Sequence, residues 1–403
     1  MDNKTRHPST YGFLSRIDCI VEVYKEKIPH NGEDAYVYSV NSAAGLVGVF
    51  DGCGGAGAKR YAKLQGKTGA YAASRIVSVA FADWFSAQLE SNSEEMEQSI
   101  KSCIRERLNA CHSVIGEESR LLSPMVKTLP STAAVALCRE DEGYISVDCF
   151  WAGDSRIYLL NSDGLAQLST DDLSVTDAME NLYEDGVMTN VISKSRDFSV
   201  HHHKIKITKP SFVFAATDGC FGYVSTPMEF EYMLVESLML SQNVCEWEQA
   251  LSDCFGRVAG DDYTLCGIAL GYGDFQTMRE DFIPRGNFLH QNYISIMNGM
   301  DRTDKTELWK QYKDNYYRYQ TLIERTDIGD IVPTSSPQRC PHCGSIMDGV
   351  VCRRCADVPP QPMKCMRCGA PVYGNSTICE SCSAAGGKLS GALWNKPGNS
   401  DLD

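Results

Sequence analysis

Four CxxC pairs near the C-terminal end limit most strongly what this sequence can fold into. Of the 18 cysteines in the 403 residues, ten lie singly between Cys19 and Cys266. The other eight come in pairs separated by two residues: Cys340, Cys343, Cys352, Cys355, Cys365, Cys368, Cys379 and Cys382. One such pair can place two thiolates at adjacent corners of a tetrahedron, and two pairs complete a four-cysteine zinc site. The spacing therefore predicts two bound Zn²⁺ ions.

This segment, residues 339–383, resembles a double zinc ribbon. Gly344 and Gly369 each follow a cysteine pair and suit the turn that brings backbone amides toward the sulfurs. Apolar residues are too few for a core, so we expect metal binding to supply most of the folding free energy. Such modules bind proteins or nucleic acids. Mild positive charge and a near absence of aromatic residues favour a protein-binding or substrate-recruiting role here.

The rest of the chain has the composition of a folded, acidic protein. Apolar residues make up 43% of the sequence, charged residues 22%, and the formal net charge is −14. Residues 336–403 carry more Lys/Arg than Asp/Glu, so the acidic excess lies in residues 1–335 and argues against nucleic-acid binding there. The polar start and the short apolar runs predict a cytoplasmic protein without membrane contact. In that reducing compartment we expect no disulfides, and the ten single cysteines are read as ordinary residues.

Apolar periodicity divides the chain into domains. Strands are predicted at 35–40, 45–50, 144–150, 156–160, 165–168, 206–216 and 264–270, and helices at 61–89 and 94–118. This order is typical of a layered mixed α/β fold, and it gives a first domain at 11–273. A helical extension and linker follow at 274–338. Its helix at 306–325 is predicted to dock an apolar stripe on the first domain rather than on a partner. The zinc segment at 339–383 and a flexible tail at 384–403 complete the chain.

Aspartates beside glycine mark the ends of several predicted strands. The four sites are Gly32–Tyr36, Gly48–Gly52, Ala215–Gly219 and Gly260–Thr264. Any one of them alone is readily explained as a turn. Several carboxylates converging at buried strand ends would repel one another unless a cation neutralised them, and Mg²⁺ or Mn²⁺ prefers such oxygen ligands. Two such ions can activate a water molecule for attack on phosphorus.

Six ordered motifs give this pattern a family resemblance. They are Gly32–Tyr36, Val49–Gly55, Ser131–Ala133, Trp151–Tyr158, Ala216–Gly219 and Asp261–Thr264. Their order and spacing resemble the metal-dependent serine/threonine protein phosphatases of type 2C, also called PPM-type. The resemblance implies an α+β fold, a β-sandwich of two antiparallel sheets flanked by helices, with a two-metal site at one end.

The resemblance also implies roles for individual residues. Asp51 would bridge two Mn²⁺ or Mg²⁺ ions, and the Gly52 carbonyl would bind the second ion. Asp218 and Asp261 would hold the first ion, and Glu33 would reach the second through water. Asp51 and Asp218 are thus the central catalytic residues.

Three further acids belong to the same implied cluster. Asp34, next to Glu33, is a further candidate residue of the Mn²⁺ or Mg²⁺ site, and Asp154 would help Asp218 hold a third, weaker metal ion. The ligand at the last motif is either Asp261 or the adjacent Asp262, and the family pattern favours Asp261.

Three positions depart from the family pattern. Cys53 stands where histidine protonates the leaving oxygen, so either the thiol or a water molecule supplies that proton. Pro29 replaces an arginine that grips the phosphate, which leaves Lys27 and His30 as the candidate phosphate ligands. Leu173 replaces a common histidine within residues 171–189, the stretch that aligns with the family's substrate flap.

These observations predict a metal-dependent enzyme that hydrolyses phosphoserine and phosphothreonine in proteins through a hydroxide bound by two metals. We expect a phosphorylated protein as substrate, a cognate Ser/Thr kinase system as partner in signalling, targeting by the zinc ribbon, and neither a nucleic-acid nor a membrane partner. The alternative is a catalytically weak pseudophosphatase that acts as a protein- or nucleic-acid-binding regulatory module. Because every implied metal position is filled, we favour the enzyme.

Overall fold

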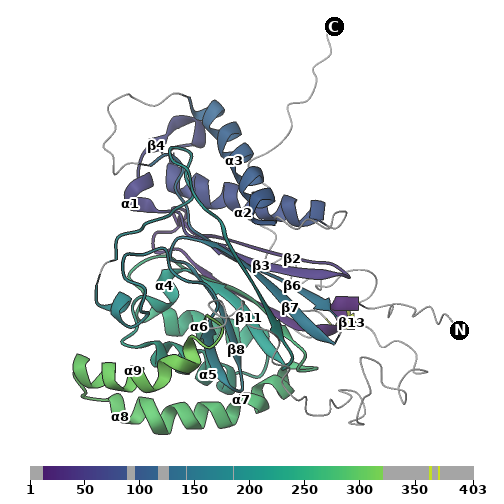
Figure 1. Ribbon diagram of the computed structural model, residues 1–403, viewed down its shortest axis with the longest axis vertical. Coiled ribbons are helices and arrows are strands. Elements are labelled where there is room, and N and C mark those ends of the chain that lie inside the picture. Colours follow the sequence, from purple (N-terminus) through teal and green to yellow (C-terminus); the bar gives the residue numbers. More distant parts are fainter. Residues whose placement is uncertain are drawn as a thin grey trace, which may run out of the picture.

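Two five-stranded antiparallel sheets stack on each other in this computed structural model (Figure 1). The structure describes residues 12–88, 96–116, 127–141, 143–184, 186–320, 363–364 and 371–372. The first sheet runs β1 (Ile17–Lys25), β12 (Tyr263–Leu270), β11 (Ser211–Ala216), β8 (Arg156–Asn161) and β9 (Gly164–Gln167). The second runs β10 (His201–Ile207), β7 (Tyr144–Ala152), β6 (Ala133–Asp141), β3 (Ala44–Phe50) and β2 (Ala35–Val40). The expected two-sheet α+β sandwich is confirmed.

Apolar side chains from both sheets fill the space between them. Val47 and Val49 of β3 meet Val213 of β11 and Ile268 of β12 in one buried cluster. Strands β3, β8, β11 and β12 are buried along their whole length, because helices cover the outer faces of the sheets. This explains why these strands appear in the sequence as continuous apolar runs.

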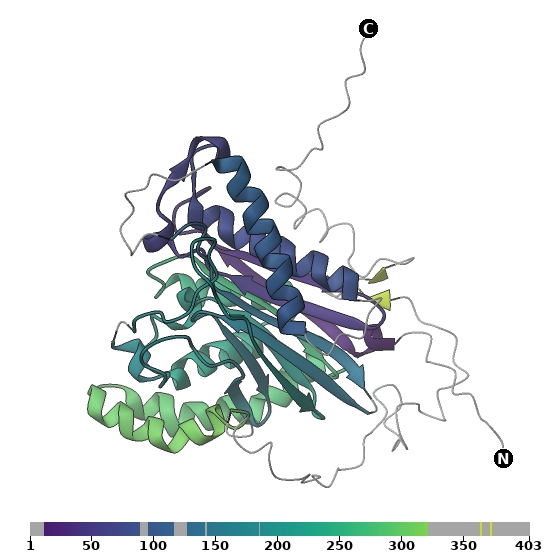
Figure 2. The same ribbon diagram turned by 45° about the horizontal axis from the view of Figure 1, so that its top comes forward.

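Helices cover both outer faces of the sandwich. Helices α2 (Gly69–Gln88) and α3 (Met96–Ile115) lie over the sheet that contains β2 and β3, as Figure 2 shows. Helices α5 (Pro227–Leu240), α6 (Val244–Gly256) and α7 (Phe275–Leu289) pack on the other sheet. Thr226, Asn243 and Asp274 cap α5, α6 and α7, respectively. Each accepts a hydrogen bond from the backbone amide three residues further along the chain.

The shorter elements connect these layers. The 3₁₀ turns are Gly12–Arg16, Ala62–Leu64 and Glu180–Leu182, and the single-turn helices are α1 (Gly54–Gly57) and α4 (Asp218–Phe221). After α7 come a π-helical turn (His290–Ile294), α8 (Ser295–Met297) and α9 (Arg302–Tyr316).

Two predicted elements have different boundaries in the structure. The helix expected from residue 61 begins only at Gly69, because β4 (Arg60–Tyr61) and β5 (Lys67–Thr68) form a hairpin first. Gln65 and Gly66 turn this hairpin with φ values of 55° and 76°, which no α-helix accommodates. The strand expected over 206–216 is two strands that belong to different sheets, since β10 ends at Ile207 and β11 begins at Ser211.

The predicted docking of the C-terminal helix is confirmed for α9. It begins earlier than expected, at Arg302, because Asp301 caps it by accepting a hydrogen bond from the Asp304 amide. Its aromatic residues Trp309, Tyr312 and Tyr316 are buried in the same core as Phe230 and Leu234 of α5. Residues 274–320 therefore pack on the same core as the first sheet.

The predicted zinc cysteines and the tail at 384–403 lie outside the described residues. In that part of the chain the structure describes β13 (Met363–Lys364) and β14 (Pro371–Val372), which pair antiparallel. Among all described residues, no helix is both long and apolar enough to cross a membrane.

Candidate active site

The strand ends bring the predicted acids together at one end of the sandwich. Ala35 at the start of β2 pairs with Phe50 at the end of β3, so Asp34 and Asp51 flank one strand pair. Ala216 at the end of β11 pairs with Leu265 near the start of β12, which places Asp218 near Asp261. Asp154 follows the end of β7 in the same region, and its charge acts on that of Asp218.

Asp34 is the most enclosed of these acids, with 2% of its surface exposed. Its Oδ2 accepts hydrogen bonds from the Thr217 hydroxyl at 2.9 Å and the Thr264 hydroxyl at 2.7 Å. Burial raises the pKa of Asp34 to about 7, against the effect of these two hydrogen bonds, and the charge of Asp218 raises it further. These contacts tie the starts of β2, α4 and β12 to one carboxylate.

Asp51 is positioned through its backbone by the Ser131–Ala133 motif. The Asp51 amide donates to the Thr132 hydroxyl at 3.0 Å, and the Thr132 amide donates to the Asp51 carbonyl at 2.8 Å. Thr132 also shares a hydrogen bond of 2.7 Å with the Ser155 hydroxyl. Burial and then the charge of Asp34 hold the pKa of Asp51 well above its usual range.

Asp154 supplies the observation that tests whether these acids suit a cation. Its Oδ1 is buried and has no hydrogen-bond partner among the described residues. Burial and then the charge of Asp218 raise the pKa of Asp154 to about 7. A buried, unpaired carboxylate oxygen surrounded by other acids is a suitable ligand for Mg²⁺ or Mn²⁺. No three His, Cys, Asp or Glu side chains of the described ranges form a ready-made metal site as they stand, so an ion would have to draw these carboxylates inward.

Glu33 lies beside α1 and the β4–β5 hairpin. The Thr68 hydroxyl donates to Glu33 Oε1. A Cβ on Gly54 would lie 2.1 Å from Glu33 Oε2, so any other residue there would displace this carboxylate. Burial raises the pKa of Glu33, and Thr68 partly offsets that rise.

Asp261 and Asp262 divide their roles in the structure. The Asp262 carboxylate accepts from the backbone amides of Glu33 at 2.6 Å and Lys27 at 2.7 Å, which fixes the loop before β2. Asp261 is exposed, and its Oδ1 accepts from the Asp262 amide at 2.9 Å. A Cβ on Gly219 would lie 1.9 Å from the Asp262 carbonyl oxygen, so this close approach to the Asp218 segment requires glycine.

A pocket of about 190 Å³ opens beside Glu33, Asp261 and Asp262. Lys27, one of the two predicted phosphate ligands, lines it, whereas His30 is not among its lining residues. Arg60 and Lys67 of the β4–β5 hairpin also line the pocket, and the sequence analysis missed both. Their stretch reads as the start of a helix, so no local signal pointed to them.

Cys53 begins the loop after Gly52 with its amide donating to the Pro130 carbonyl at 3.2 Å. Burial and then the charges of Asp51 and Asp154 hold the pKa of the Cys53 thiol well above its usual range. Cys53 is therefore a protonated thiol in this environment, which can donate a proton but lacks the reactivity of a thiolate.

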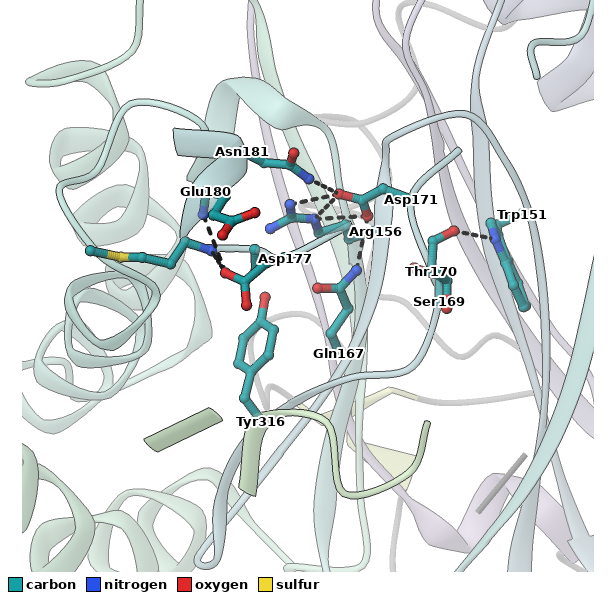
Figure 3. A network of polar contacts seen from close by, with 12 residues as sticks. Trp151, Arg156, Gln167, Ser169, Thr170, Asp171, Asp177, Glu180, Asn181 and Tyr316 are labelled. Atoms are coloured by element: carbon teal, nitrogen blue, oxygen red, sulfur yellow. Dashed lines mark hydrogen bonds and ion pairs between the residues drawn. The ribbon is translucent and has the colours of Figure 1, made fainter. Parts of the chain in front are cut away.

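A buried ion pair holds the start of the predicted flap. Arg156 binds both oxygens of Asp171 at 2.6–3.0 Å, and Gln167 and Asn181 add hydrogen bonds to the same carboxylate (Figure 3). Arg156 also stands two residues from Asp154, so this network fixes the chain between site and flap.

The predicted flap is held by contacts between its own residues and by a contact with helix α9. Leu173 forms a β-bridge with Met188, and Asp172 accepts from Asn190 at 2.7 Å. Trp309 of α9 donates to the Asp177 carboxylate at 3.0 Å. The predicted flap therefore contacts the extension at 274–320.

The family model described as Protein phosphatase 2C matches residues 27–255, more than half of the chain. The chain belongs to the protein phosphatase 2C family. It is accordingly a protein phosphatase, a hydrolase of phosphoric monoesters. The match ends before Asp261 and β12.

The solved structures to which this chain is similar include bacterial phosphatases of low sequence identity. Serine/threonine phosphatase Stp1 from Staphylococcus aureus is 16% identical, with 67% of this chain and 99% of that chain covered and a TM-score of 0.49. PstP/Ppp from Mycobacterium tuberculosis is 16% identical, with 63% and 99% covered and a TM-score of 0.46. The catalytic domain of PstP in complex with two manganese ions is 14% identical, with 63% and 98% covered and a TM-score of 0.43. No curated protein matches the chain.

The buried acids of this family member give a stability prediction. Burial raises the pKa of Asp154 to about 7 and holds the pKa of Asp51 well above its usual range, so the metal-free fold loses stability as pH rises above about 4 and these groups ionise in the folded chain. In EDTA at pH 8 we expect Asp51→Asn and Asp154→Asn to unfold at higher temperature than wild type, by about 2–4 °C for each kcal/mol recovered. Lowering the pH should reduce the difference in unfolding temperature between each variant and wild type.

Thermal unfolding by circular dichroism, with and without excess Mn²⁺, measures the effect. Mn²⁺ should reverse the order, because it stabilises only the chain that retains the carboxylates. The exposed Asp163, changed to Asn, is the matched control and should follow wild type. Variants that melt below wild type in EDTA would show that these carboxylates stabilise the metal-free fold.

Proposed function

We propose that this chain hydrolyses phosphoserine and phosphothreonine in proteins with two divalent cations, Mn²⁺ or Mg²⁺, held by the buried acids. The observation that carries the proposal is the cluster at one end of the sandwich, where the pKa values of Asp34, Asp51, Asp154 and Asp218 are all raised and one Asp154 oxygen is unpaired. Such an arrangement stores negative charge that a divalent cation neutralises. A pseudophosphatase that acts only as a binding module would not need this cluster of buried acids.

The ligands are assigned as the family pattern suggests. Asp51, Asp218, Asp261 and the Gly52 carbonyl would hold the two ions. Glu33 contributes through water. Asp261 is chosen over its neighbour because the neighbouring carboxylate is already engaged by two backbone amides.

Two supporting assignments complete the metal site. Asp154 with Asp218 would hold a third, weaker ion. Asp34 would keep the cluster together through its Oδ2, which accepts from both threonine hydroxyls, and as a further candidate ligand it would reach an ion through its other oxygen, Oδ1.

The reaction uses the remaining residues for binding and proton transfer. Bound at this site, the two cations would polarise the phosphate and acidify an attacking water molecule. Lys27, Arg60 and Lys67 line the adjacent pocket and can bind phosphate oxygens in place of the missing arginine. The Cys53 thiol, whose raised pKa keeps it protonated, would donate a proton to the leaving oxygen, and a water molecule is the other candidate source of that proton.

Activity should depend on metal and on the central acids. We expect wild type to release phosphate from p-nitrophenyl phosphate and from phosphoserine peptides with Mn²⁺ or Mg²⁺, and to be inert in EDTA. Asp51→Ala and Asp218→Ala should lower kcat by on the order of 100-fold or more, because each removes charge stabilisation at the reacting centre. Asp163→Ala is the control. If wild type and both variants are folded yet equally inert with either metal, the pseudophosphatase reading holds instead.

The Cys53 position should distinguish substrates by their leaving group. We predict that Cys53→His raises kcat on a phosphoserine peptide by about 10- to 100-fold, because imidazole is a better proton donor near neutral pH. The gain on p-nitrophenyl phosphate should be much smaller, since its leaving group is stable without a proton. Cys53→Asn, which is larger than cysteine and carries no titratable proton, serves as the size control. Equal gains on both substrates would show that the histidine acts in some other way.

The C-terminal segment is proposed to be a targeting module with two structural Zn²⁺ ions. The eight cysteines at 340–382 supply the ligands, and the paired strands β13 and β14 fall on either side of Cys365 and Cys368 in the sequence. We propose that the module recruits a phosphorylated protein rather than a nucleic acid. The chain would act in the cytoplasm, in signalling, opposite a cognate Ser/Thr kinase system.

Metal analysis of the full chain checks the zinc assignment. Elemental mass spectrometry should find two zinc ions per chain, and Cys365→Ser should lower the content to one, because a site with three thiolates binds far more weakly. The exposed Cys245 of α6, changed to Ser, should leave the content at two. A zinc content unaffected by Cys365→Ser would contradict the assignment.

A further inference from the structure

A second pocket, of about 390 Å³, lies between α3 and the chain that follows the flap. Its lining comprises Arg105, Leu108 and Asn109 of α3 together with Ser193, Lys194, Ser195, Arg196, Asp197 and Phe198. None of these residues belongs to the metal site or to the phosphate pocket described above. The pocket therefore needs its own explanation.

The lining of this second pocket is basic in an acidic protein. Arg105, Lys194 and Arg196 face a single lining acid, Asp197, although the chain as a whole carries a formal charge of −14. Asp197 is itself bound by Arg105 and, at 3.2 Å, by Lys101. Burial and then repulsion from Arg105 lower the pKa of Lys101, as expected where cations gather. An anion would relieve this repulsion.

A buried hydroxyl in the pocket lining gives a second, independent indication of a ligand. Ser193 is 2% exposed, and its hydroxyl has no hydrogen-bond partner among the described residues. A buried donor left unpaired destabilises a fold, so such a group normally meets a ligand or water. A hydroxyl among three cations suits an oxyanion.

The second pocket is connected to the metal site by a short backbone ladder. Gly52 bridges Ser131, and Ser131 bridges Ile192, with hydrogen bonds of 3.0 and 3.1 Å between the last two. Each bridge spans about 5 Å, so Ile192 lies about 10 Å from Gly52 and Ser193 is the next residue. An extended peptide covers that distance with three or four residues.

We infer that this pocket binds a carboxylate side chain of the phosphoprotein substrate, three or four residues from the phosphoserine that is hydrolysed. The inference rests on the proposed function and adds a sequence preference to it. The chemistry recognised is that of an oxyanion on a peptide. Arg105, Lys194 and Arg196 supply the charge, and Ser193 supplies the buried hydroxyl.

A double variant with a matched control tests the inference. Lys194→Gln/Arg196→Gln removes two charges from the pocket, and Lys204→Gln/Lys206→Gln removes two from exposed positions on β10. The peptides carry one phosphoserine with Glu at positions three and four on its N-terminal or its C-terminal side, and partner peptides carry Gln there. Melting temperatures confirm that both variants fold.

The binding arm is independent of catalysis. Fluorescence anisotropy in EDTA should show wild type and the β10 control binding one of the two Glu peptides about tenfold more tightly than its Gln partner, with the preference lost in the pocket variant. Raising the salt concentration should weaken the preference, because both partners are charged. Equal affinity of wild type for Glu and Gln peptides on both sides would overturn the inference.

The kinetic arm uses the same peptides with Mn²⁺. Wild type should favour the same Glu peptide in kcat/KM by about tenfold, mainly through KM, and the pocket variant should lose that preference while hydrolysing p-nitrophenyl phosphate at the wild-type rate. An active enzyme without the preference would contradict the inference and leave the proposed function intact. An enzyme inert toward every substrate would contradict the proposed function, and the binding arm would then decide the inference alone.

Discussion

Burial of like charges at one end of the sandwich is the constraint on which the rest of the structure depends. Asp34, Asp51 and Asp218 lie where water does not screen them, and their pKa values rise as a consequence. The fold tolerates them through specific support. Two threonine hydroxyls hold Asp34, and Thr132 fixes the backbone of Asp51. The negative charge that these hydrogen bonds do not neutralise is available to bind a divalent cation. Without the cation, that charge lowers the stability of the fold.

The sequence predicted the framework of the site because its signals are local. Apolar runs that end in Asp-Gly gave β3 and β11 together with their acids, and Asn161 to Gly164 marked the tight turn between β8 and β9. The family motifs then related these strands and acids to one two-sheet fold. The position of Cys53 was also predicted from the sequence, because Cys53 directly follows Asp51 and Gly52.

The parts that escaped prediction depend on contacts between distant segments. Arg60 faces Glu33 because the chain reverses at Gln65 and Gly66, and a left-handed turn leaves little trace in apolar periodicity. The ion pair between Arg156 and Asp171 was also not predicted, although Arg156 belongs to one of the family motifs. No pattern in the sequence around either residue indicates the other as its partner. The basic pocket combines a helix with a loop about 90 residues later in the chain. Its character appears only when these segments lie side by side.

The pairing of β1 with β12 has a consequence for how the protein is made. Lys25 lies opposite Tyr263 in the finished sheet, and β12 is also the neighbour of β11, so the first sheet cannot close until the last strand has left the ribosome. At about 5–20 residues per second, β1 waits on the order of 10–50 s for its partner. Until then, the apolar face that the second sheet turns toward β1 and β12 has no complete partner. Long-range pairing of this kind folds slowly and leaves strand edges exposed in the growing chain.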